Sequence, residues 1–216
     1  MTLRERQPAM DAQSVGNQGR LSKDERQHRQ LKRLETAIDA KFRDVVPRDK
    51  PDFLVQVRGI ETGVEVTDGS SEELRRALVI KDDEGLKHYS VTGFRDCRDT
   101  GKTSNPELLA RLKDGEAVSS EEAALFWAER IASRIRTKVG LLRSGEIERF
   151  QQNWLCVVNE QPDDWSLKTE FYRGLLLGSL GSSKALRESF DVIYVLSDFH
   201  IFIIDRTHFR AERLKD

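Results

Sequence analysis

The sequence has little of several features that define specialised protein classes. It contains two cysteines, Cys97 and Cys156, and neither has metal-ligand spacing around it, so reduced thiols in an intracellular setting are expected. No apolar run reaches the roughly 18 residues of a membrane helix, and no secretory signal is visible. We therefore expect a soluble cytoplasmic protein. Charge of one sign is also not in excess, because the formal net charge is −1. Any nucleic-acid-binding surface must then be a local patch.

The domain organisation follows from composition. Residues 1–20 are rich in Gln, Ser, Gly and Arg without apolar periodicity, which predicts a disordered N-terminal tail. Residues 21–216 are long enough for one domain with a sizeable core.

The centre of the chain is the stretch PDFLVQVRGIETGVEVTDG, residues 51–69. Its β-branched and apolar residues, bounded by Pro and Gly, predict strands over 52–57 and 63–67. The turn between them is expected to contain Gly59 and Gly63. Because side chains alternate along a strand, Val64 and Val66 should face one side while Glu65 and Thr67 face the other. Asp52 heads the preceding strand, so the carboxylates of Asp52 and Glu65 are expected to converge on one spot beside the sheet.

A helix is predicted before this stretch. Ser22 and Glu25 form a capping-box pattern, and the helix should end before Pro47. Its apolar residues follow at helical spacing, namely Leu31, Leu34, Ile38 and Phe42. Lys and Arg make its outer face basic.

The remaining elements follow from the same rules. Residues 70–73 resemble a helix start, and a long helix runs from Ser119 or Ser120 through Leu142, with an apolar stripe facing the core. Residues 153–159 form a strand buried on both faces. Further predicted elements are a possible strand at 88–91, a charged loop at 95–102, a helix at 166–180 and strands at 190–196 and 199–204.

Two other patterns do not indicate a site. A phosphate loop ending in Gly101-Lys102-Thr103 is excluded, because seven residues separate Gly93 from Gly101 where four are required. His200 lies in the last predicted strand without a partner at ligand spacing, so a structural role is expected.

Two side chains have two interpretations each. Glu35 sits one position beside the apolar stripe of the first helix, where it is an ordinary flanking residue or leans over the sheet edge toward Asp52. Lys138 lies on the edge of the long helix's stripe, where it extends its ammonium to water or points at the carboxylates across the sheet.

The order of these elements, with Pro-Asp followed by Glu-x-Thr, resembles the PD-(D/E)XK nuclease superfamily. The resemblance covers most of residues 21–210 and implies an α/β, restriction-endonuclease-like fold, with a central mixed sheet flanked by helices. It implies that Asp52, Glu65 and Glu35 form the acidic site and that Asp52, Glu65 and the carbonyl of Val66 bind Mg²⁺ or Mn²⁺. The usual lysine has no match at Thr67. Some branches supply this amine from the following helix, and Lys138 fits that position.

The resemblance implies a metal-dependent phosphodiesterase that acts on DNA, in defence or repair, with RNA as another possible polymer. Thr67 keeps a second class open, a catalytically inactive module that binds nucleic acid or regulates a partner. A third is an interaction protein whose N-terminal arm and basic helix dock a partner. The expected partners besides nucleic acid are a second copy of the chain in a homodimer or another protein.

Overall fold

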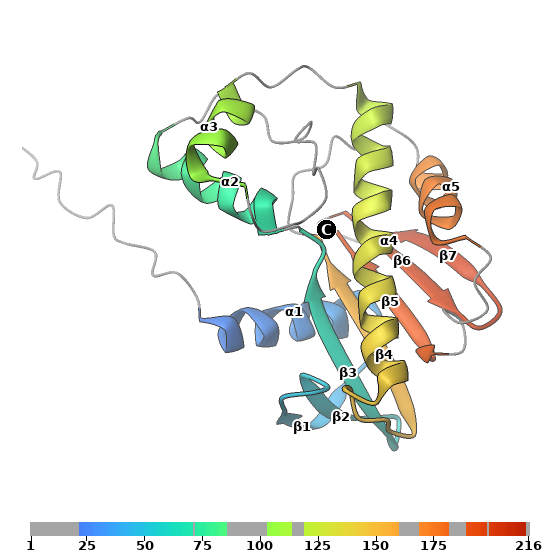
Figure 1. The fold of residues 1–216 in the computed structure, drawn as a ribbon. Coiled ribbons are helices and arrows are strands. Elements are labelled where there is room, and N and C mark those ends of the chain that lie inside the picture. The colour runs from blue at the N-terminus through green and yellow to red at the C-terminus, as the bar shows by residue number, and fades with distance from the viewer. Residues whose placement is uncertain are drawn as a thin grey trace, which may run out of the picture.

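The computed structural model describes residues 22–70, 72–85, 103–113, 119–159, 169–181, 189–197 and 199–214. These residues form a seven-stranded mixed sheet with helices on both faces (Figure 1). The predicted α/β class, a central mixed sheet flanked by helices, is confirmed. The predicted tail at 1–20, the strand at 88–91, the loop at 95–102 and Cys97 lie outside the described residues. Among the described helices, none is long and apolar enough to cross a membrane.

The strands lie in the sheet in the order in which they occur in the chain. The first three form an antiparallel meander, followed by two strands parallel to the third and two antiparallel ones. Their bounds are β1 Phe42–Pro47, β2 Phe53–Val57, β3 Ile60–Asp68, β4 Gln152–Val158, β5 Val192–Leu196, β6 His200–Asp205 and β7 Phe209–Arg213.

The β2–β3 hairpin turns on two residues, Arg58 and Gly59, which have φ values of 52° and 80°. Two consecutive positive φ values define the turn whose twist matches adjoining strands. The prediction that Gly63 belongs to this turn is wrong, because Gly63 lies inside β3. A Cβ there would approach Phe150 Cδ2 to 2.8 Å and Pro51 Cγ to 3.0 Å, so the glycine permits close packing.

Helix α1, Lys23–Ala37, begins with the predicted capping box between Ser22 and Glu25. It ends earlier than predicted, because the chain leaves helical geometry after Ile38 and Asp39 has a φ of 47°. Phe42 opens β1 instead of closing the helix, and its ring packs against Trp154 with centroids 6.2 Å apart. This tertiary contact explains why helical spacing alone misassigned Phe42.

Helix α4, Ser120–Ser144, matches the predicted long helix and is capped by Ser119. It connects the parallel strands β3 and β4, as a crossover helix must. All predicted stripe residues are buried, namely Ala124, Trp127, Ala128, Ile131, Ile135, Val139 and Leu142.

The two faces of the sheet have separate cores (Figure 1). Helix α1 covers one face, where Val64 and Val66 are buried. Helix α4 covers the other together with α5, Thr169–Leu180, whose predicted first three residues lie outside the described part. Because Val64 and Val66 face α1, strand alternation turns Glu65 toward α4.

Helices α2, Glu72–Asp83, and α3, Asn105–Lys113, follow β3 and share a small core of their own, formed by Leu74, Ala77 and Leu108. The start of α2 was predicted, but α3 was not. Its signal was Ser104, whose hydroxyl accepts a hydrogen bond from the Glu107 amide, followed by Pro106 in the first turn. Strand β7 was also not predicted, because its sequence FRAER is mostly charged and partly exposed.

The last strands follow the predicted positions of 190–196 and 199–204 closely. The turn between β5 and β6 is held by Ser197, whose hydroxyl accepts a 2.9 Å hydrogen bond from the His200 amide. His200 is buried at the start of β6.

Candidate functional site

Asp52, Glu65 and Lys138 lie close enough to interact electrostatically where the start of β2 pairs with β3, with Lys138 reaching in from α4. Asp52 directly precedes β2, and the next residue, Phe53, pairs with Val64, so Asp52 stands across from Glu65. The ammonium of Lys138 lies 2.5 Å from Oε1 of Glu65. Three side chains from a loop, a strand and a helix therefore surround one point.

Asp52 is held from two directions. Its Oδ2 accepts a 2.8 Å hydrogen bond from the Val66 amide, and its Oδ1 accepts a 2.5 Å hydrogen bond from Nε2 of Gln27. The residue is only 7% exposed. A buried carboxylate with two donors keeps a fixed orientation.

Glu65 is contacted by the ammonium of Lys138, and the backbone amide of Asp52 also lies against its carboxyl group and lowers its pKa. It is 3% exposed, and Lys138 contacts Oε1. Its other oxygen, Oε2, is buried and accepts no hydrogen bond from the described residues. A buried carboxylate oxygen without a donor is costly. A cation or a hydrogen-bond donor placed beside Oε2 would therefore stabilise the ionised carboxylate.

Lys138 reaches the sheet because α4 runs antiparallel to β3. Arg134, one turn earlier on α4, donates a 3.0 Å hydrogen bond to the carbonyl of Ser70, just beyond the end of β3. Lys138 follows the same line and meets β3 deeper in the sheet, at Glu65. Of its two interpretations, the structure shows the one in which the ammonium points at a carboxylate, with the side chain 22% exposed. Thr67 lies on the same side of β3 as Glu65 and supplies no amine.

Glu35 is not brought to Asp52. Its Oε1 accepts a 2.9 Å hydrogen bond from the Phe42 amide, and its other oxygen pairs with Lys32. These contacts lower the pKa of Glu35, that with Lys32 most. Glu35 thus links the end of α1 to the start of β1. Gln27 occupies the position beside Asp52 that was expected for Glu35.

Gln27 was missed by sequence reasoning, although a signal was present. It lies four residues before Leu31 and so continues the buried stripe of α1 by one turn. A polar side chain on such a stripe indicates a polar partner across the interface.

Both carboxyl groups resist ionisation. Burial raises the pKa of Asp52, an effect that the Val66 amide, Lys138 and Gln27 reduce. Burial also raises the pKa of Glu65, the negative charge of Asp52 raises it further, and Lys138 lowers it. Burial is the main reason why the ionised form of both carboxyl groups is costly at this site.

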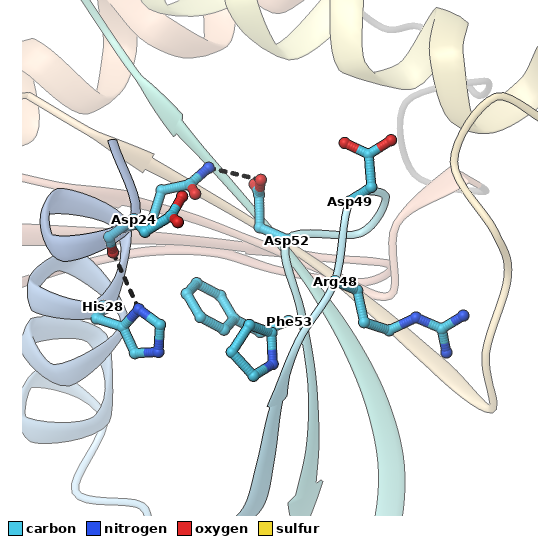
Figure 2. A pocket seen from close by; sticks show the side chains of 8 residues that line it. Asp24, His28, Arg48, Asp49, Asp52 and Phe53 are labelled. Atoms are coloured by element: carbon cyan, nitrogen blue, oxygen red, sulfur yellow. Dashed lines mark hydrogen bonds between the residues drawn. The ribbon is translucent and has the colours of Figure 1, made fainter. Parts of the chain in front are cut away.

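A pocket of about 360 Å³ opens beside Asp52, between α1 and the β1–β2 loop (Figure 2). Besides Asp52 and Gln27, its lining comprises Asp24, His28, Pro47, Arg48, Asp49 and Phe53. The edge of the His28 ring meets the Phe53 ring, with centroids 4.8 Å apart. The pocket gives Asp52 access to solvent.

The oxygen ligands suit a hard cation. Mg²⁺ in proteins takes one or two carboxylates and completes its shell with waters and substrate oxygens. The N–H and C=O of one strand residue point the same way, so the carbonyl of Val66 is directed to the Asp52 side of β3, as its amide is. Within the described ranges, no group of three His, Cys, Asp or Glu side chains is placed to hold a metal. Any metal would rest on two carboxylates and neutral oxygens.

Comparison of the chain with protein-family models, curated proteins and solved structures finds no match.

Proposed function

We propose that this protein is a metal-dependent phosphodiesterase of the PD-(D/E)XK type that cleaves nucleic acid, with DNA as the substrate. The observation that carries the proposal is the meeting of Lys138 with Glu65 across from Asp52. An amine beside two buried carboxylates suits hydrolysis of a phosphodiester, because the carboxylates would hold a metal that supplies an activated water and the amine would stabilise the developing charge.

The residues present fit Mg²⁺ or Mn²⁺. The unpartnered Oε2 of Glu65, a carboxylate oxygen of Asp52 and the Val66 carbonyl are the oxygens that would hold it. When bound, the metal would acidify a water and offset charge on the phosphate. Its positive charge would also stabilise the ionised form of both buried carboxyl groups.

Lys138 would orient the water or stabilise the oxyanion of the phosphate. Its ammonium is held by Glu65 at one end of a long side chain from α4. The amine absent at Thr67 is thus replaced by one from the helix.

Nucleic acid is favoured as the polymer, with DNA as the substrate to test first, because basic side chains lie on the helix beside the site. Lys23 and Arg26 are exposed in the first turns of α1, and the charge of Lys23 acts on Asp52. These cations would contact phosphates flanking the one that is cleaved.

The test is cleavage of single- and double-stranded DNA and RNA with Mg²⁺ or Mn²⁺. Lys138→Ala should lower the rate by about 10²–10⁴-fold, the usual loss for one such contributor, while the circular dichroism spectrum stays that of wild type. Glu65→Gln should be at least as severe because it weakens a metal ligand. Lys81→Ala on α2 is the control and should cleave as wild type does. Equal cleavage by Lys138→Ala would contradict the role given to the helix amine.

A second function is favoured by two observations: Thr67 stands where the superfamily has its lysine, and both oxygens of Asp52 already accept hydrogen bonds, from Gln27 and from the Val66 amide. An aspartate whose oxygens are already paired suits a module that binds nucleic acid without cleaving it. Absence of cleavage by wild type on every substrate, together with salt-sensitive binding, would establish this second function instead.

A further inference from the structure

The metal site proposed above lacks a third protein side chain. Asp52 and Glu65 supply the carboxylates, and no third acidic, histidine or cysteine ligand joins them among the described residues. A third ligand from those residues must therefore be a neutral oxygen. Carbonyl oxygens of Gln and Asn are ordinary ligands of hard cations.

Gln27 is the side chain in position to supply that oxygen. Its amide lies 2.5 Å from Oδ1 of Asp52, and both residues line the same pocket (dashed line to Asp52 in Figure 2). The hydrogen bond crosses from α1 to the β1–β2 loop, 25 residues away in sequence. The end of Gln27 therefore already touches a proposed metal ligand.

The primary amide of Gln27 can act toward Asp52 and a cation either as a hydrogen-bond donor or as an oxygen ligand. It carries a donor and an acceptor on one planar group, and rotation about its last torsion, which has two broad and nearly equivalent minima, swaps them. Facing Asp52 alone, the donor Nε2 is favoured because a carboxylate only accepts hydrogen bonds. Facing a cation held by the same carboxylate, the oxygen Oε1 is favoured.

We propose that Gln27 is the third side chain of the metal site. It donates Nε2 to Asp52 in the metal-free protein and turns Oε1 toward the cation when metal binds. This inference rests on the proposed function, since it requires that Asp52 and Glu65 bind a metal. The unpartnered Oε2 of Glu65 is the independent sign that a cation belongs here.

A merely structural role for Gln27 makes a different prediction. If the amide only supports Asp52 through its donor, Gln27→Lys keeps that donor and should retain Mn²⁺ affinity, while Gln27→Glu repels Asp52 and should weaken Mn²⁺ binding. Metal binding measured without substrate separates the two roles. The probe is Mn²⁺ alone, added to the full chain and followed by electron paramagnetic resonance and calorimetry, with the melting temperature measured in EDTA.

Three variants of Gln27 give distinct expectations. Gln27→Met keeps the length but removes the oxygen, and the Mn²⁺ dissociation constant should rise by about 10–100-fold, as for other groups that support a metal ligand. Gln27→Glu supplies a charged oxygen, and Mn²⁺ should bind more tightly than to wild type. Gln27→Lys retains a donor without an acceptor, and binding should be lost.

Gln30→Met is the matched control, because Gln30 is buried on the same helix. It should leave Mn²⁺ affinity unchanged, whatever it does to the melting temperature. If Gln27→Met and Gln27→Glu bind Mn²⁺ as wild type does, or if Gln27→Lys does so and Gln27→Glu binds it more weakly, while Glu65→Gln fails to bind it, the inference is overturned and the proposed function survives. If wild type itself fails to bind Mn²⁺, both are overturned.

Discussion

Glu65 is a glutamate placed where its charge is costly. It is buried on the face of the sheet covered by α4, it faces the charge of Asp52, and one of its oxygens lacks a donor among the described residues. Functional sites often keep such groups at the expense of stability. The stability of the metal-free protein should therefore depend on the protonation of Glu65.

The sign of this dependence follows from the raised pKa of Glu65. The folded chain holds the proton more tightly than the unfolded chain, so the stabilisation is complete below the ordinary pKa of a glutamate and is lost as pH rises through the folded value. In EDTA at about pH 8, Glu65→Gln should melt above wild type, by about 2–4 °C for each kcal/mol recovered. The difference should shrink as the pH falls through the raised pKa of Glu65, because wild type then takes up the proton.

Scanning calorimetry at several pH values measures this difference. Glu61→Gln is the control, an exposed glutamate on the same strand, and it should show no such trend. A Glu65→Gln protein that is less stable at every pH would mean that the ion pair with Lys138 outweighs burial.

Most of the site was predictable from individual residues, and one part was not. Alternation along β3 and the register of a hairpin are local, so Asp52 and Glu65 followed from short patterns. The apolar stripe on α4 predicted which face of the helix carries Lys138. The prediction that Glu35 joins the site was wrong, because periodicity gives the direction of a side chain but not which turn of α1 lies beside Asp52. Two turns separate Gln27 from Glu35, and only packing of α1 on the sheet decides between them.

At the scale of elements, α4 approaches the end of β3 more closely than a Cβ on the next residue, Gly69, would allow. Gly69 follows β3, and its amide donates a 2.8 Å hydrogen bond to the carbonyl of Val158 at the end of β4. A Cβ at this position would lie 2.5 Å from Cδ1 of Ile131 and 3.3 Å from that carbonyl oxygen. Arg130 of α4 also donates a hydrogen bond to the Gly69 carbonyl, at 3.2 Å. This contact sets the height of α4 above Glu65.

Gly69→Ala should destabilise the fold by about 1–3 kcal/mol, as overpacking of a tight core does. Ile131→Val removes the atom that clashes, so the double variant should be more stable than the sum of the two single effects predicts. Chemical denaturation measures all three. Gly140→Ala is the control, because a Cβ at this exposed helical glycine meets nothing within 4 Å, and it should be neutral or stabilising. Additive effects would show that α4 moves aside freely.

Element boundaries illustrate what sequence patterns could not predict. The predicted capping box at Ser22 begins α1, and of the two predicted caps of α4, Ser119 or Ser120, the structure shows Ser119. The end of α1 was wrong, because the apolar Phe42 continued the helical spacing while contributing to a different element. Strand β7 escaped prediction because an edge strand with one covered face needs little apolar sequence.

At the scale of the whole molecule, charge is nearly balanced, so the nucleic acid of the proposed function would have to be attracted by a local patch. Lys23 and Arg26 are exposed on α1 near the site. In a Glu65→Gln background, which allows binding without cleavage, each of Lys23→Gln and Arg26→Gln should reduce the slope of log affinity against log salt by about 1. Fluorescence anisotropy with labelled DNA measures the slope.

Lys113→Gln on α3 provides the control for this titration, since it removes an exposed cation from another element. Its slope should equal that of the parent. Equal slopes for all variants would place the nucleic-acid path elsewhere on the molecule.

The α2–α3 pair has a consequence for how such a protein diversifies. Parallel strands need a connection of about a dozen residues or more, and the 25 residues of α4 already exceed that length. The pair, packed on its own small core, is therefore an addition to a link already complete without it. Selection can lengthen, exchange or delete this addition while the sheet and its carboxylates are inherited unchanged. New binding contacts can evolve on α2 and α3 without a change in the site around Asp52 and Glu65.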